Sequence, residues 1–125
     1  MTDIVTPRVV QKPWGHELIL AHTDRYVGKL LHIHRGQALS RQYHRVKDET
    51  LYVHQGVLIL ELGAAPDVVR LEVPAGGGFH VVPGTIHRFQ APDDQDVDLI
   101  EMSTPELDDV VRLEDRYGRE GTSNP

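Results

Sequence analysis

Four side chains that can bind a metal ion through nitrogen or oxygen lie in two short segments of the sequence. Within residues 36–56, Gln42 and His44 are two positions apart and would project from one face of a strand. Glu49 follows after a polar turn, and antiparallel pairing would bring it back beside them. His87 follows a tight Pro-Gly turn on another short segment. The spacing predicts one site built from these four residues.

The donor set limits the chemistry of this site. Two imidazoles, one carboxylate and one amide oxygen suit Zn²⁺, Mn²⁺, Fe²⁺ or Ni²⁺, and the residues alone do not choose among these ions. The chain has no cysteine, which excludes disulfides, thiolate metal sites and thiol nucleophiles.

The overall charge and hydropathy exclude other classes of protein. The 19 acidic residues outnumber the 13 Lys and Arg and give a net charge of −6, which opposes binding to nucleic acid. No apolar run approaches the ~20 residues that a membrane helix needs. The first residues lack the basic and apolar segments of a signal peptide, so we expect a cytoplasmic protein.

The elements that must position the site read as short strands. Stretches rich in Val, Ile and Leu recur between Gly, Pro and Asp residues, which is typical of all-β sandwiches and barrels. The sequence predicts strands near 16–20, 28–34, 38–44, 49–54, 57–62, 68–73, 79–82, 87–90 and 97–102.

We expect a single domain over residues 1–125, with its core at about 12–119. Residues 1–11 are expected to form an arm that pairs with a sheet edge, and residues 120–125 a frayed tail. From Thr104 onward, a Thr-Pro start predicts a short C-terminal helix or turn with Leu107, Val110 and Val111 on one face.

These residues resemble the cupin superfamily. Its first motif, G-x5-H-x-H-x3,4-E-x6-G, is matched in spacing by Gly36, Gln42, His44, Glu49 and Gly56, with Gln in place of the first His. Its second motif is matched by Gly76, Gly84 and His87. The resemblance implies an all-β antiparallel jelly-roll barrel with one divalent metal ion, for which it favours zinc.

The chain is most similar to one branch of cupins, the mannose-6-phosphate isomerase domain of the type II enzymes. The shared signatures are KPWG at 12–15, LSRQYH at 39–44 and DDVVRLEDRYGR at 108–119. The chain departs from the branch at Lys47, where Arg is usual, and at Thr50-Leu51, which replace a His-Trp pair. The resemblance implies aldose–ketose isomerisation of a sugar phosphate.

An isomerase of this kind needs a base that moves a proton between C1 and C2. Lys29 is one candidate, because strand alternation places it on the face of Leu31 and the resemblance includes a Lys there. Glu101 is the other candidate, although a regular strand is expected to turn Ile100 and Met102 inward instead.

A substrate phosphate needs cations, and Arg41 and Arg88 are the candidates nearest the predicted metal ligands. Alternation places Arg41 on the face opposite Gln42 and His44 unless a bulge intervenes.

Two other functions stay open. One is a metal-dependent dioxygenase, which would use Fe²⁺ or Mn²⁺ and an apolar substrate pocket. The other is a non-catalytic sugar-binding cupin. A homodimer is expected from the exposed sheet and the arm. A second His-x-His pair, His32 and His34, flanks the apolar Ile33 and is expected to face solvent or a subunit interface.

Overall fold

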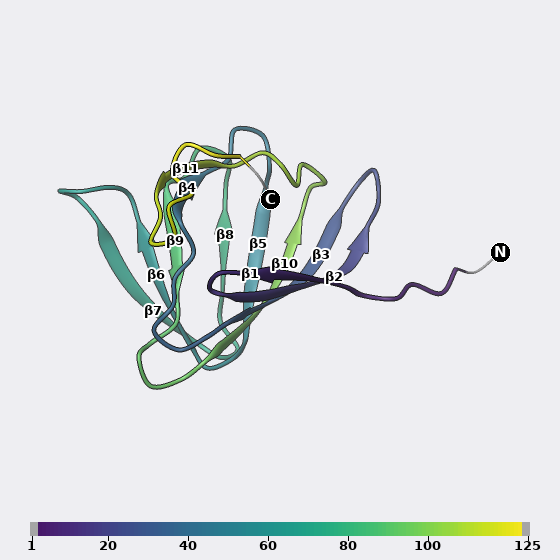
Figure 1. Cartoon of the computed structure of the whole chain (residues 1–125), viewed down its shortest axis with the longest axis horizontal. Coiled ribbons are helices and arrows are strands. Elements are labelled where there is room, and N and C mark those ends of the chain that lie inside the picture. The colour runs from purple at the N-terminus through teal and green to yellow at the C-terminus, as the bar shows by residue number, and fades with distance from the viewer. Residues whose placement is uncertain (1–2, 124–125) are drawn as a thin grey trace.

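The computed structural model describes residues 3–123, which form two antiparallel sheets and no helix (Figure 1). The larger sheet has the order β1-β2-β3-β10-β5-β8 and the smaller one β11-β4-β9-β6-β7. The strands are β1 (Arg8–Lys12), β2 (Gly15–His22), β3 (Val27–Ile33), β4 (Arg41–Tyr43), β5 (Glu49–Gln55), β6 (Val57–Leu62), β7 (Val69–Pro74), β8 (Gly78–Val81), β9 (His87–Gln90), β10 (Val97–Ser103) and β11 (Val111–Glu114). All nine predicted strands are present, and the all-β expectation is confirmed.

The core lies between the two sheets, and β2, β3, β5 and β10 of the larger sheet alternate buried and more exposed positions. On β3, Val27, Lys29, Leu31 and Ile33 are all buried, whereas the residues between them are partly exposed. Inward side chains of the larger sheet meet those of the smaller one, and the shared cluster includes Leu31, Ile33, Leu51, Val53, Leu58, Leu60, Phe89 and Leu99.

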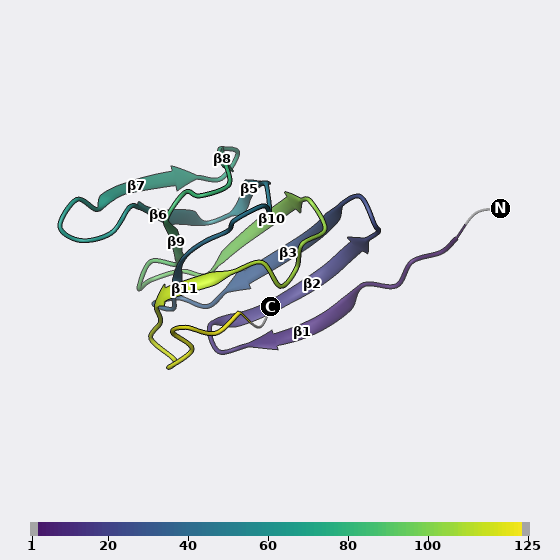
Figure 2. The ribbon, with the colours of Figure 1, turned by 90° about the horizontal axis from the view of Figure 1, so that it is seen from above.

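The N-terminal arm extends the larger sheet at its edge. Strand β1 pairs antiparallel with β2 from Arg8↔Ile19 to Lys12↔Gly15, and Figure 2 shows β1 lying outside β2. The expectation that the arm pairs with a sheet edge is therefore confirmed for Arg8 to Gln11, while residues 3–7 form no strand and residues 1–2 lie outside the described part.

The C-terminal segment forms turns and a strand rather than a helix. The backbone turns at Leu107 and Asp108, and β11 then pairs with β4. Val111 and Arg112 pair with Tyr43 and Gln42 of the neighbouring strand, so this part of the backbone is extended rather than helical. Beyond β11, the expected fraying of 120–125 is not seen at Gly121 and Thr122, which both hydrogen-bond to Arg112; residues 124–125 are outside the described part.

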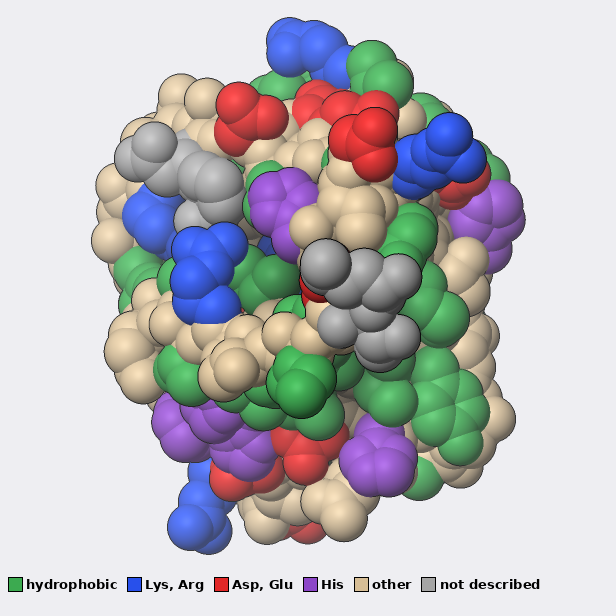
Figure 3. Space-filling view, turned by 90° about the vertical axis from the view of Figure 1, so that its right-hand side faces the viewer, with side chains coloured by type: hydrophobic (Ala, Val, Ile, Leu, Met, Phe, Trp, Pro, Cys, Tyr) green, Lys and Arg blue, Asp and Glu red, His purple; other side chains and the backbone are tan. Residues whose placement is uncertain are grey.

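Between residues 3 and 123, the structure contains no helix that could cross a membrane. On the face shown in Figure 3, charged side chains of both signs and several histidines lie at the surface.

Candidate metal centre and adjoining cavity

His44, Glu49 and His87 meet in the interior at the ends of three strands. His44 follows β4, Glu49 begins β5 and His87 begins β9. Glu49 Oε1 lies 3.2 Å from His44 Nε2 and 3.4 Å from His87 Nε2. All three residues are at most 2% exposed, so the cluster is shielded from bulk water.

The outer nitrogen of each imidazole is held by a backbone carbonyl. His44 Nδ1 donates to Asp109 O at 2.6 Å, and His87 Nδ1 donates to Thr85 O at 2.8 Å. A carbonyl oxygen only accepts hydrogen bonds, so each Nδ1 carries the proton and each Nε2 is left with its lone pair in the neutral ring. Metal-binding histidines are oriented in this way.

The cluster fits a divalent cation. Two lone pairs and a carboxylate face one another, an arrangement that a cation bound between them would stabilise. Within the described residues, Glu49 Oε2 and His87 Nε2 are buried without a hydrogen-bond partner, which is rare for such atoms. Burial acts to raise the pKa of Glu49, but the neighbouring His44 and His87 rings and the Lys47 charge hold that pKa well below its ordinary value.

Gln42 lies beside this cluster. Its Cα is paired with that of His87 between β4 and β9, and its side chain lines the adjoining cavity. Its Oε1 accepts a hydrogen bond from the Ser40 hydroxyl at 2.5 Å. Gln42 is thus a neighbour of the three-residue cluster, and its role as a fourth ligand remains a prediction.

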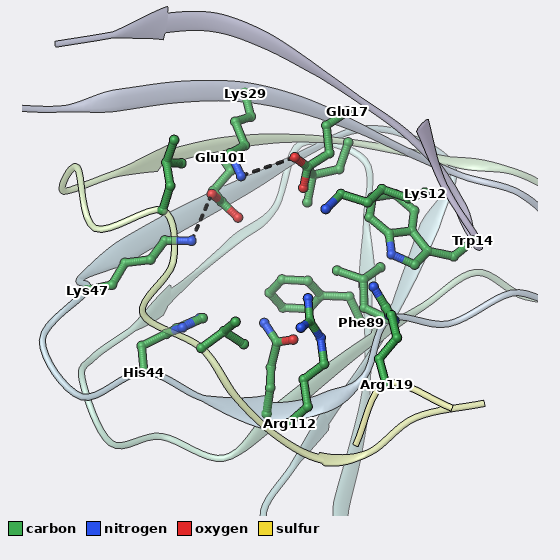
Figure 4. A pocket seen from close by; sticks show the side chains of 15 residues that line it. Lys12, Trp14, Glu17, Lys29, His44, Lys47, Phe89, Glu101, Arg112 and Arg119 are labelled. Carbon is green, nitrogen blue, oxygen red and sulfur yellow. Dashed lines mark hydrogen bonds and ion pairs between the residues drawn. The ribbon is translucent and has the colours of Figure 1, made fainter. Parts of the chain in front are cut away.

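A cavity adjoins the cluster through His44, which lines it (Figure 4). On the side nearest His44, Lys47 Nζ lies 3.3 Å from Glu49 Oε2 and 3.4 Å from Glu101 Oε2. Lys29 lines the same cavity and makes an ion pair with Glu17 at 3.2 Å. Both residues expected to carry the proton transfer, Lys29 and Glu101, therefore face the cavity.

Burial and neighbouring charges shift the pKa values of Glu101 and Lys47 in the cavity. Burial and the nearby Glu49 carboxylate raise the pKa of Glu101 to about 7, despite the charges of Lys47 and Lys29. For Lys47, burial would lower the pKa, but the carboxylates of Glu101 and Glu49 outweigh it and raise the pKa above the ordinary value.

The expected alternation of β10 was wrong. Leu99, Glu101 and Ser103 are buried, whereas Met102 is 49% exposed and Ile100 lies on the outer face. The register of β10 against β5 shifts between Asp98 and Leu99, while its pairing with β3 places Glu101 opposite the inward-facing Lys29. A buried carboxylate thus takes the position at which an apolar residue was expected.

Arg41 and Arg88 lie on the outer side of the smaller sheet and do not line the cavity described here. Arg41 donates to Glu61 at 2.8 Å and to Gly63 O at 3.0 Å, and Arg88 Nε donates to Leu39 O at 3.0 Å. Strand alternation is the reason, because Arg88 lies between the buried, inward-facing His87 and Phe89. Their placement does not support a role in binding substrate within the cavity.

Three cations missed as site residues line the cavity instead. Lys12, Arg112 and Arg119 come from β1, β11 and the C-terminal loop, and Figure 4 shows them on the side away from Lys47. Burial and the charges of Lys29, Arg112 and Arg119 lower the pKa of Lys12, although Glu17 opposes this. The signal was present in the KPWG and DDVVRLEDRYGR signatures, which contain all three residues.

Comparisons with known proteins match this architecture. Residues 2–115 match the family model described as Mannose-6-phosphate isomerase C-terminal. The mannose-1-phosphate guanylyltransferase ManC of Salmonella typhimurium is 33% identical over 118 residues, which are 90% of this chain and 23% of that protein. The xanthan biosynthesis protein XanB of Xanthomonas campestris is 30% identical over 115 residues, covering 90% of this chain and 24% of XanB. The chain spans about a quarter of the length of these curated relatives.

Solved structures agree at the level of the fold. The capsular polysaccharide assembling protein CapF of Staphylococcus aureus superposes with a TM-score of 0.76 at 17% identity, covering 88% of this chain and 35% of CapF. A sugar phosphate isomerase of the cupin superfamily from Silicibacter pomeroyi gives a TM-score of 0.64 at 20% identity, covering 71% of this chain and 58% of that protein. The expected cupin fold is confirmed.

Proposed function

Because the chain belongs to the family of mannose-6-phosphate isomerase C-terminal domains, we propose that it is a metal-dependent isomerase that interconverts an aldose phosphate and its ketose. The leading substrate is mannose 6-phosphate. The observation that carries the proposal is a single cavity lined by His44 of the three-residue cluster, by the buried Glu101 and by three cations on its other side.

The metal would be held by His44, Glu49 and His87, with Gln42 proposed as a fourth ligand. A divalent ion there would act as a Lewis acid toward the carbonyl and neighbouring hydroxyl oxygens of the sugar. The residues around it exclude bulk water, since all three members of the cluster are buried.

Glu101 is the residue that we propose moves the proton. Its carboxylate would take the proton from C2 of the aldose and deliver it to C1, while the O2 hydroxyl proton passes to O1 through the enediol, which gives the ketose without loss of atoms or charge. Glu101 Oε2 has an ion pair with Lys47 but no hydrogen bond among the described residues, whereas Lys29 is engaged by Glu17. Lys29 then serves as a hydrogen-bond donor to a sugar hydroxyl.

Lys12, Arg112 and Arg119 are proposed to bind the substrate phosphate, in place of Arg41 and Arg88. Arg112 is 6% exposed, and its Nε has no hydrogen-bond partner among the described residues. A phosphate oxygen is the kind of acceptor that a guanidinium binds strongly. The charged lining also disfavours the oxygenase alternative, which requires an apolar pocket.

The proposal is tested by following deuterium exchange at C2 of mannose 6-phosphate and formation of fructose 6-phosphate, with the metal-loaded chain in D₂O. We expect both, and we expect Glu101→Gln to lower kcat by about 100-fold or more while keeping its bound metal. Binding of mannose 6-phosphate without exchange would overturn the isomerase and favour the sugar-binding alternative. Unphosphorylated mannose is the matched control and should react far more slowly.

A further inference from the structure

A second group of metal-binding side chains lies outside the cavity, where β3 ends and β10 begins. His32 is on β3, His34 follows that strand and Asp96 immediately precedes β10. One ligand atom from each of the three lies within 4.8 Å of the others. Asp96 Oδ2 is 3.2 Å from His32 Nε2 and 4.0 Å from His34 Nδ1.

His32 is oriented from its far side by a carboxylate. Its Nδ1 is 2.5 Å from Asp98 Oδ1, and the two residues are Cα partners in the pairing of β3 with β10. A carboxylate accepts from Nδ1–H, so Nε2 is left facing Asp96. This carboxylate–histidine arrangement orients imidazole ligands at metal sites. The His16 ring stacks on His32, with centroids 5.1 Å apart and planes 21° apart, and limits its rotation.

Asp96 is also oriented from its far side, in this case by a backbone N–H group. Its Oδ1 accepts the Arg35 backbone N–H at 2.8 Å, which leaves Oδ2 directed at the two imidazoles. His34 is anchored through its backbone, since its N–H donates to Trp14 O at 3.0 Å. Each of the three side chains thus has one ligand atom near the others, and those of His32 and Asp96 are also restrained from behind.

We propose that His32, His34 and Asp96 form a second divalent-metal site, selective for zinc-like ions and completed by water. The carboxylate-to-imidazole distance of 3.2 Å equals that in the interior cluster, and 4.0 Å needs only a small closing movement. Two nitrogen ligands favour Zn²⁺ or Ni²⁺ over Ca²⁺ or Mg²⁺.

The site is open to solution. The side chains of His34 and Asp96 are 58% and 44% exposed, so an ion can enter without rearrangement of the core. Its effect would be structural, because it would tie the end of β3 to the loop before β10. The site does not depend on the proposed isomerase, and its failure would leave that function unaffected.

The test is the number of Zn²⁺ ions bound per chain by equilibrium dialysis, compared between wild type and two surface variants. We expect His34→Ala and Asp96→Asn each to bind one Zn²⁺ fewer than wild type, whether or not the interior cluster is also filled. His22→Ala, which removes an exposed histidine outside the group, is the matched control and should bind as many as wild type.

The histidine NMR signals provide a second measurement. We expect Zn²⁺ to shift the ring signals of His32 and His34 in wild type and to leave His22 unchanged. The proposal would be overturned if wild type and His34→Ala bound equal numbers of Zn²⁺ ions and the His34 signal of wild type did not shift. The group would then be only an ion-paired cluster of His32 with Asp96 and Asp98.

Discussion

Asp109 holds His44 and the loop that follows it with both its backbone and its side chain. Its carbonyl oxygen accepts the His44 Nδ1–H at 2.6 Å. Its carboxylate accepts the backbone N–H groups of Arg45, Val46 and Lys47 at 3.1, 2.7 and 2.8 Å. The C-terminal signature thus fixes the loop between two proposed metal ligands, His44 and Glu49.

Replacement of Asp109 by Ala should loosen this loop. We expect the affinity of the interior site for Zn²⁺ to fall by about 10-fold to 100-fold, as for other residues that orient metal ligands. Loss of the three hydrogen bonds should also lower the free energy of unfolding by about 2 kcal/mol. Competition with a chelator and urea unfolding measure the two effects. Asp108→Ala is the control, because Asp108 is the exposed neighbour of Asp109. Equal Zn²⁺ affinities in Asp109→Ala and Asp108→Ala would contradict the role of Asp109.

If the three cations of the cavity bind the substrate phosphate, removing one of them should weaken substrate binding more than it slows turnover. We expect Lys12→Gln to raise KM for mannose 6-phosphate by about 10-fold, because one charged hydrogen bond to the phosphate is lost. The change in kcat should be smaller. Steady-state kinetics measure both. The control Arg8→Gln removes an exposed cation from the same strand and should leave KM unchanged. An unchanged KM in Lys12→Gln would place the phosphate elsewhere.

Much of the fold followed from the sequence because the strands are short, apolar and separated by Gly, Pro and Asp. Lys29 was placed correctly because β3 alternates without interruption. Glu101 and its neighbours were assigned to the wrong faces, because the rule that apolar residues point inward fails where a buried carboxylate is ion-paired, as Glu101 is with Lys47. Arg112 and Arg119 were missed as site residues because only the pairing of β11 with β4 brings that segment over the cavity.

The contribution of Asp115 to the stability of the fold should depend on pH. Burial acts to raise the pKa of Asp115, but hydrogen bonds from Arg119 outweigh it and hold the pKa below its ordinary value. A lowered pKa means that the ionised carboxylate stabilises the fold above its unfolded pKa of about 3.9 and that this stabilisation is lost as the pH falls through the folded value. We expect Asp115→Asn to be less stable than wild type at pH 7 and the difference to shrink as the pH falls below 4. Thermal unfolding across pH 3–7 checks this, and a constant difference would contradict it.

Gly15 explains why the KPWG signature ends in glycine. Its φ is +153°, and a Cβ there would lie 1.9 Å from the carbonyl oxygen of His32, so the neighbouring strand would have to move. We expect Gly15→Ala to lower the free energy of unfolding by about 3 kcal/mol or more. Gly28→Ala is the control, because its Cβ would meet only the Ala21 Cβ at 3.8 Å. Equal stability of the two variants in urea unfolding would show that β2 adapts.

If metal bound by His44, Glu49 and His87 makes the chain an isomerase, its activity must depend on added metal. The most direct measurement is the rate of deuterium exchange at C2 of mannose 6-phosphate by chelator-treated protein, followed as Zn²⁺ or Mn²⁺ is added back. We expect no exchange before addition, a saturable rise on addition, and no rise in a folded Glu49→Gln variant. Exchange that is independent of added metal, or equal in Glu49→Gln, would rule out a metal-dependent isomerase.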